Sequence, residues 1–209
     1  MIDEKSFSLR YFALPVLAVL ALGGCAATGT QNVDTADDRG DAVMSLDYRD
    51  FQKAAGEMVD GLLGSGAVVD PDGGRRVLMM GRISNETMQR IDTDQLVRPI
   101  RRDLLNSGRV VVSSAVGLQG PEDESSMAAR ELRESDEFDQ RTTVDKGQMI
   151  APDASLSGTI RQRTIQMDNG RNQVEYYFEL ALSDIATGLV IWEDQRLIVK
   201  RGDGDTVSW

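Results

Sequence analysis

The chain has 209 residues with 34 acidic and 23 basic side chains, no histidine, and a formal net charge of −11 at pH 7. The lack of histidine removes the commonest general base and the commonest neutral metal ligand. The negative charge disfavours nucleic acid and acidic lipid surfaces as partners. We therefore expect no catalytic residue, no metal site and no cofactor. Catalysis by paired carboxylates stays open in principle, but the sequence places none of them in a recognisable pair.

Residues 1–24 are typical of a lipoprotein signal peptide. A weakly basic start precedes a short apolar run, residues 11–22, whereas a transmembrane helix needs roughly 20 apolar residues. The motif Leu22-Gly23-Gly24-Cys25 then matches the bacterial lipobox, in which cleavage falls before the cysteine. We expect Cys25, the one cysteine of the chain, to carry acyl chains such as palmitate and to act as a membrane tether. The alternative is an ordinary signal peptide with a chance cysteine.

The residue after the cysteine bears on which membrane holds the chain. Gram-negative lipoproteins with aspartate at this position usually stay in the inner membrane, so Ala26 favours the outer membrane. Loss of the signal peptide removes two acidic and two basic residues, and the net charge stays −11. With Cys25 acylated, no thiol is left for a disulfide, and the domain must be held together by its core alone.

Residues 25–45 are expected to be the acylated cysteine followed by a flexible linker. The segment 26–44 is small, polar and acidic, which is typical of disorder. Fully extended, it reaches at most ~65 Å. An arm that docks on the domain is the alternative, and Val33 and Val43 are too sparse to favour it. A globular domain is expected at residues 46–202, and a disordered tail at residues 203–209.

The domain is predicted to begin with a helix and a buried strand. The helix follows Asp47, which can cap it, and ends at residues 64–66, where two glycines stand. Its apolar face holds Phe51, Ala55, Met58, Val59, Leu62 and Leu63. Residues 76–83 open with an apolar block that is typical of a strand buried on both faces, and residues 84–87 break the run.

A second helix and a second strand follow. The helix is expected to begin at Asp92 or Thr93 and to end at residues 106–108. Pro99 lies inside it, and because proline lacks a backbone N–H and clashes one turn back, we expect a kink or a late start. Residues 109–114 are predicted to be a strand.

The next segment alternates irregular and helical stretches before the chain returns to strands. Residues 119–125 are predicted to be a loop, residues 126–138 a charged surface helix, and residues 139–153 irregular. Residues 155–167 form a strand whose apolar residues change phase, for which a bulge would account.

The last third predicts an antiparallel meander. Asp168-Asn169-Gly170 favours a type I′ hairpin turn, and residues 174–182 alternate apolar and polar without interruption. A turn at residues 186–188 leads to a closing strand, residues 189–200, with Trp192 expected in the core. The chain is therefore predicted to be α+β, with a mixed sheet of four to five strands flanked by helices and ending in a three-stranded antiparallel meander.

Three stretches carry a resemblance to a known family. The first is the strand from Arg76 with the following Asn85-Glu86-Thr87. The second is residues 100–112, IRRDLLNSGRVVV. The third is residues 178–182, FELAL, followed by residues 187–192, TGLVIW. Together with the lipobox, this ordered set resembles the LpoB family of outer-membrane lipoproteins, whose domain is TolB N-terminal-like.

The resemblance implies a regulatory function. Members of the family bind a docking domain on a bifunctional penicillin-binding protein, which is a peptidoglycan glycosyltransferase and transpeptidase, and stimulate it. It therefore implies a lipoprotein that faces the periplasm, takes part in cell wall biogenesis and cell shape, has no small-molecule substrate and is not an enzyme. The linker here is shorter than in well-known relatives and lacks proline. The alternative is a subunit of an envelope secretion or appendage assembly complex, like the curli-pore lipoproteins.

Four residues are candidates for contact with the partner. Arg161 and Arg163 alternate with apolar positions on one predicted strand, and an exposed arginine pair suits an interface. The alternative is that they only keep a sheet face soluble. Asn85 and Thr87 match a turn of the family, where a structural role is the alternative to partner contact.

Overall fold

The computed structural model describes residues 32–203, apart from residues 36, 41, 72, 117–122 and 169. The predicted signal peptide and Cys25 lie outside the described residues. The chain divides into two units, Met1–Gly40 and Asp41–Trp209, and the description that follows concerns the second. Among the described residues, no helix is long and apolar enough to cross a membrane.

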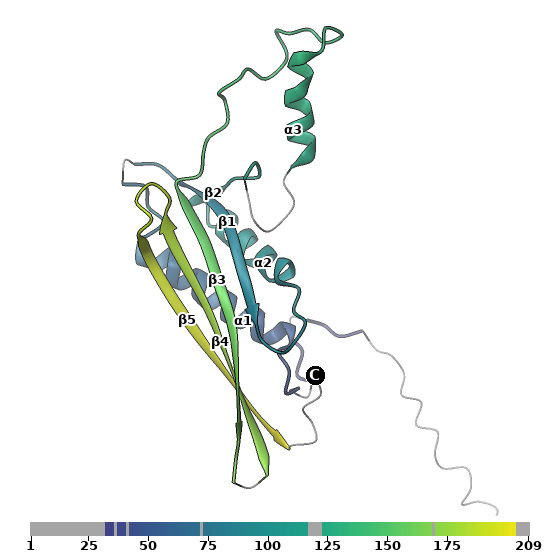
Figure 1. Cartoon of the computed structure of the whole chain (residues 1–209), viewed down its shortest axis with the longest axis vertical. Helices are drawn as coiled ribbons and strands as arrows, with labels where there is room; N and C mark the ends of the chain where they lie inside the picture. Colours follow the sequence, from purple (N-terminus) through teal and green to yellow (C-terminus); the bar gives the residue numbers. More distant parts are fainter. Residues whose placement is uncertain are drawn as a thin grey trace, which may run out of the picture. The chain divides into compact units, whose positions relative to one another are not determined.

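The domain is an α+β fold with one five-stranded mixed sheet, as predicted (Figure 1). The helices are α1 (Tyr48–Ser65), α2 (Thr93–Asn106) and α3 (Glu124–Glu131), the last followed by a 3₁₀ turn, η1 (Leu132–Glu134). The strands are β1 (Arg76–Glu86), β2 (Val110–Val112), β3 (Ala154–Gln166), β4 (Arg171–Asp184) and β5 (Val190–Asp203). Their order is β2-β1-β3-β4-β5. β1 is parallel to β2 and β3, and β3, β4 and β5 form the predicted antiparallel meander.

The core lies between one face of the sheet and the helices α1 and α2, which lie behind the sheet in Figure 1. Asp47 caps α1 with a full capping box, which satisfies backbone N–H groups that the helix itself cannot. From the sheet, β4 contributes the alternating residues Val174, Tyr176, Phe178, Leu180 and Leu182, each at most 1% exposed. The opposite face of the sheet carries no helix among the described residues.

Several boundaries differ from the prediction. β1 continues to Glu86, through the residues expected to break it, because they still pair with β3. α2 starts at Thr93 with Pro99 inside it, so the predicted late start of this helix is wrong. The helix continues past the proline because its apolar side, including Ile100 and Leu104, is buried against the core. α3 begins at Glu124 and ends seven residues short of Phe138; it buries no side chain, so no packing extends it.

The meander differs from the prediction in three details. β3 pairs with β4 without a break from Ala154 to Gln166, so the expected bulge is not there; the irregularity lies in β1, between Met80 and Ile83. The apolar phase changes because β3 leaves the core after Ile160. The hairpin closes through Met167 N–H donating to the carbonyl of Arg171, a three-residue connection rather than the two-residue type I′ turn.

The edges of the meander also depart from expectation. Trp192 is half-buried and packs against the core rather than within it. β5 continues to Asp203, the residue at which the predicted tail begins. Residues 204–209 lie outside the described part of the chain.

Candidate docking surface

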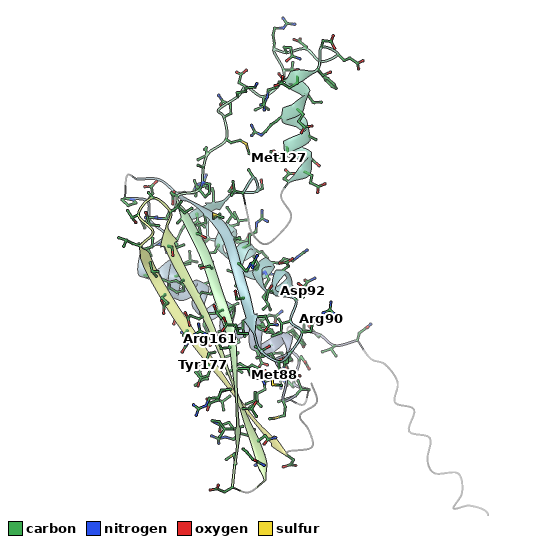
Figure 2. All side chains as sticks on the ribbon, in the orientation of Figure 1. Met88, Arg90, Asp92, Met127, Arg161 and Tyr177 are labelled. Carbon is green, nitrogen blue, oxygen red and sulfur yellow. The ribbon has the colours of Figure 1, made fainter. Side chains whose placement is uncertain are left out.

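The face of the sheet that carries no helix holds both predicted arginines. Ile160 points into the core, and side chains alternate along a strand, so Arg161 and Arg163 share the opposite face. The register sets Arg161 opposite Tyr177 on β4, and Tyr177 opposite Leu197 on β5. The next row is Arg163, Glu175 and Val199. Figure 2 shows Arg161 and Tyr177 close together on this face. We call these six residues the docking patch.

The patch mixes charge with exposed apolar area. Leu197 is 53% exposed and Val199 is 43% exposed, although both belong to a strand of the central sheet. Arg161 bridges neighbouring strands: its Nε lies 3.1 Å from Glu86 Oε2 and its guanidinium lies 3.4 Å from Glu179 Oε2. The side chain of Arg161 is still about half exposed, so its remaining donors can reach a partner.

A carboxylate orients the tyrosine of the patch. The hydroxyl of Tyr177 donates to Glu175 Oε2 at 2.7 Å. This hydrogen bond, with smaller contributions from a hydrogen bond donated by Gln173 and from the charge of Arg163, lowers the pKa of Glu175, and the bond to Tyr177 raises the pKa of Tyr177. At neutral pH the carboxylate is therefore ionised and the hydroxyl protonated. The ring is held in place beside two guanidinium groups, an arrangement that can bind a partner by stacking, hydrogen bonding and charge.

Asn85 lies near the end of β1 and Thr87 directly after the strand, at the rim of the patch, and their side chains hold together the turn that follows. Asn85 Oδ1 accepts hydrogen bonds from the N–H and the hydroxyl of Thr87, and Asn85 Nδ2 donates to the carbonyl of Gln89 at 2.8 Å. These contacts within the turn fit a structural role, which is the alternative to contact with a partner. The turn projects Met88, 69% exposed, and fixes it through a hydrogen bond from its N–H to Gln162 Oε1. Figure 2 shows Met88 to the right of Arg161 and Tyr177.

Sequence reasoning missed a second cluster, which holds residues 44–46, here called the tether root. The hydroxyl of Tyr176 donates to the carbonyl of Met44 at 3.2 Å, and Lys200 Nζ donates to the carbonyl of Ser45 at 2.8 Å. Leu46 N–H donates to Gln89 Oε1 at 3.2 Å. The last two residues of the predicted linker are thus bound to the domain. No local motif marks this, because the partners stand up to 155 positions away in the chain.

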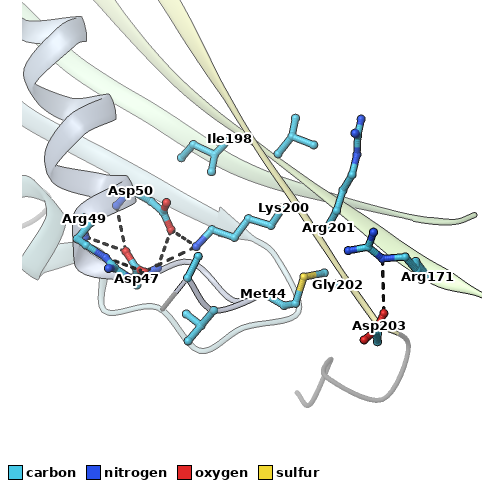
Figure 3. A pocket seen from close by; sticks show the side chains of 13 residues that line it. Met44, Asp47, Arg49, Asp50, Arg171, Ile198, Lys200, Arg201, Gly202 and Asp203 are labelled. Atoms are coloured by element: carbon cyan, nitrogen blue, oxygen red, sulfur yellow. Dashed lines mark hydrogen bonds and ion pairs between the residues drawn. The ribbon is translucent and has the colours of Figure 1, made fainter. Parts of the chain in front are cut away.

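The charges beside the root are largely buried. Lys200, whose side chain is 9% exposed, lies 2.5 Å from Asp50 Oδ2 and 3.8 Å from Asp47 Oδ2 (Figure 3). Burial acts to raise the pKa of Asp47, but hydrogen bonds from Arg49 and Asp50 N–H and the charge of Lys200 outweigh it, and the pKa is lowered. Burial, with the nearby Asp50 charge, raises the pKa of Tyr176 to about 12, so its hydroxyl stays a donor.

A cavity of about 720 Å³ opens beside the root, between residues 42–44 and the end of β5 (Figure 3). Its lining carries both signs of charge, including Arg171, Arg201 and Asp203. In the described part of the chain, no group of three or more histidine, cysteine, aspartate or glutamate residues could hold a metal ion.

The described residues form an α+β domain whose exposed sheet face carries arginine and tyrosine side chains. A family model described as "Peptidoglycan-synthase activator LpoB" matches residues 50–198. The chain belongs to the LpoB family of peptidoglycan-synthase activators, a family of regulators.

Solved structures of the same family resemble the chain at low identity. The C-terminal domain of LpoB from Escherichia coli shares 15% identity at a TM-score of 0.43, over 71% of this chain and 98% of that chain. The corresponding domain from Salmonella enterica shares 13% identity at 0.41, with the same coverage. The NMR structure of E. coli LpoB shares 15% identity at 0.38, over 97% of this chain and 94% of that chain. No curated protein matches the chain by sequence.

Proposed function

We propose that the chain is an outer-membrane lipoprotein that faces the periplasm and binds and stimulates a bifunctional penicillin-binding protein. The observation that carries this proposal is the family match over residues 50–198. The lipobox ending at Cys25 supports the membrane anchor, since two or more acyl chains hold a protein stably at a membrane. The chain itself makes no bond in the glycan; it regulates the enzyme that does.

The docking patch is the surface through which the chain engages the synthase. Tyrosine and arginine dominate the energetics of protein interfaces, and exposed apolar side chains beside them supply area that a partner can bury. Arg161, Arg163 and Tyr177 provide the first element, and Leu197 and Val199 the second. The arginines favour a docking domain that presents carboxylates. Asn85 and Thr87 act indirectly, by shaping the turn at the rim.

Stimulation follows from differential binding. A ligand shifts an equilibrium only by the difference in its affinity for the two states, so the chain must bind the active state of the synthase more tightly than the resting state. A tenfold preference corresponds to about 1.4 kcal/mol, which a single well-placed arginine contact can supply.

The test uses the chain from residue 25 onward with Cys25 replaced by serine, which removes the anchor. It is added to each purified bifunctional penicillin-binding protein of the same organism, and the rate of glycan polymerisation from lipid II is followed. We expect a several-fold, saturable increase with one synthase. No stimulation and no binding with any of them would refute the proposal and would turn the search to secretion and appendage components.

The anchor has its own test. In cells that express the full chain, we expect the wild-type protein in the outer-membrane fraction and Cys25→Ser in the soluble periplasmic fraction. Mass spectrometry of the amino-terminal peptide should show a diacylglyceryl-modified Cys25. An unmodified amino terminus generated at another cleavage site would contradict the lipobox interpretation.

A further inference from the structure

The tether root is held by side chains from three separate parts of the fold. Tyr176 of β4, Lys200 of β5 and Gln89 of the loop after β1 each bind a backbone group of one of its three consecutive residues. The root is therefore a docked segment, and it stands immediately before α1, at the point where the proposed tether meets the domain. A pull on the tether acts on these bonds before it acts on any strand.

Gln89 connects the root to the turn at the rim of the docking patch. Its side chain accepts from Leu46 N–H and donates to the Tyr176 hydroxyl at 2.7 Å. Its main chain is bound by the turn: Gln89 N–H donates to Thr87 Oγ1, and the Gln89 carbonyl accepts from Asn85 Nδ2. One residue thus takes part in both structures, and a change in the root reaches the turn through it.

The turn also contacts the docking patch. Glu86, the last residue of β1 and the one before the turn, forms the ion pair with Arg161. Met88 N–H bonds Gln162, the residue between the two arginines of β3. The contacts therefore form a continuous series from the root, through Gln89 and the turn, to the arginine that the proposed docking needs.

We infer that the tether root controls the docking patch: the seated root orders the turn of residues 87–89 and keeps the patch competent for its partner, and withdrawal of the root loosens both. This regulation rests on the proposed function only for its last step, the partner. The first step, communication from root to turn, is a property of the chain alone. Through this communication, the mechanical load on the membrane tether affects how tightly the docking patch binds its partner.

The experiment perturbs the root and observes the turn. Leu46→Pro removes the N–H that Gln89 accepts, and Tyr176→Phe removes the hydroxyl between Met44 and Gln89. Val43→Pro is the matched control, since Val43 is exposed and lies one residue upstream of the root. All variants are made in the chain from residue 25 with Cys25→Ser and carry ¹³C-methyl methionine.

The methionine methyl signals report each part separately. Met44 reports the root, Met88 the turn, and Met127, on α3, is an internal reference. We expect the Met88 signal to shift in Leu46→Pro and in Tyr176→Phe, with Met127 unchanged and the Val43→Pro spectrum like that of the parent chain at Met88. A Met44 shift with Met88 unmoved in both variants would overturn the inference, because the root would then be released without any effect on the turn.

Affinity for the synthase completes the test. We expect both root variants to bind between about twofold and tenfold more weakly than the Val43→Pro control, the factor that one typical hydrogen bond supplies. If the Met88 signal shifts in the root variants but their affinity for the synthase stays unchanged, the inference that the root controls docking is overturned. If the parent chain binds no synthase at all, the proposed function fails, and the Met88 result still decides whether the root acts on the turn.

Discussion

Replacement of Arg161 by alanine separates a docking role from a structural one, because the two predict different magnitudes. In the fold, Arg161 makes two ion pairs, with Glu86 and Glu179, from a side chain that is 54% exposed. Exposed pairs of this kind contribute about 0.2–1 kcal/mol each and are weakened by salt. We therefore expect Arg161→Ala to lower the free energy of unfolding by about 0.4–2 kcal/mol for the two pairs together, which moves the melting temperature by roughly 1–8 °C.

The same substitution should have a larger effect on docking. An arginine at the centre of an interface contributes about 2 kcal/mol or more when it is removed, which corresponds to a roughly 30-fold loss of affinity. The assay pairs urea unfolding of the variant with calorimetric titration against the synthase and the rate of glycan polymerisation. The control is Arg102→Ala, which removes an exposed arginine paired with Asp103 on α2, the helix on the opposite face of the sheet.

Two results would refute this reasoning. If Arg161→Ala lost more than about 2 kcal/mol of stability, the residue would be structural and the exposed-pair argument would fail. If Arg161→Ala and Arg102→Ala both bound the synthase within twofold of the parent chain, Arg161 would only keep the sheet face soluble. A loss of affinity shared equally by both variants would point to net charge rather than to the patch.

Three further outcomes follow from the structure. Gly158→Ala should destabilise by about 1–3 kcal/mol in urea unfolding, because its Cβ would lie 2.4 Å from the Glu179 carbonyl oxygen, whereas Gly56→Ala, with open space on α1, should be neutral or stabilising. Absorbance titration should show a tyrosine near pH 12 that Tyr176→Phe abolishes; its contribution to stability is complete below pH 10 and is lost as the pH rises toward 12. The pKa of Asp47 is lowered from 3.8, so the stability that this carboxylate contributes is lost as the pH falls below about 4. In Asp47→Asn, the free energy of unfolding measured by urea titration should therefore fall less steeply over this acidic range.

The elements with local signals were predictable from the sequence. α1 begins where Asp47 supplies a cap and ends at Gly66, whose φ of 80° lies in the left-handed region that glycine adopts freely. β4 was recognisable because one side of it is buried without interruption, so strict alternation reports its inward face. In both cases the information lies within a few neighbouring residues.

Features that depend on distant pairing were not predictable. The phase change in β3 predicts a bulge from the sequence alone, but the strand pairs without a break. The change marks the place where the strand extends beyond the helices that cover the core, which only the fold reveals. In the sequence, Lys200 looks like an ordinary charged residue of the closing strand, yet in the fold it binds Ser45 and Asp50. Arg76 reads as the polar start of a strand, yet it is 5% exposed and lies 3.5 Å from both Asp153 and Asp184.

The docked root also changes what the short linker can do. With residues 44–46 bound, the part of the proposed tether that precedes the root is residues 26–43, for which full extension sets a limit of about 60 Å, and withdrawal of the root adds about 10 Å. A partner just beyond the shorter reach can be met only by a chain that has released its root, and that chain is the one with the looser turn. In the proposed mechanism, the reach of the tether and the strength of docking therefore oppose each other. A longer linker would remove the conflict, because the tether would then slacken before any load reached Gln89.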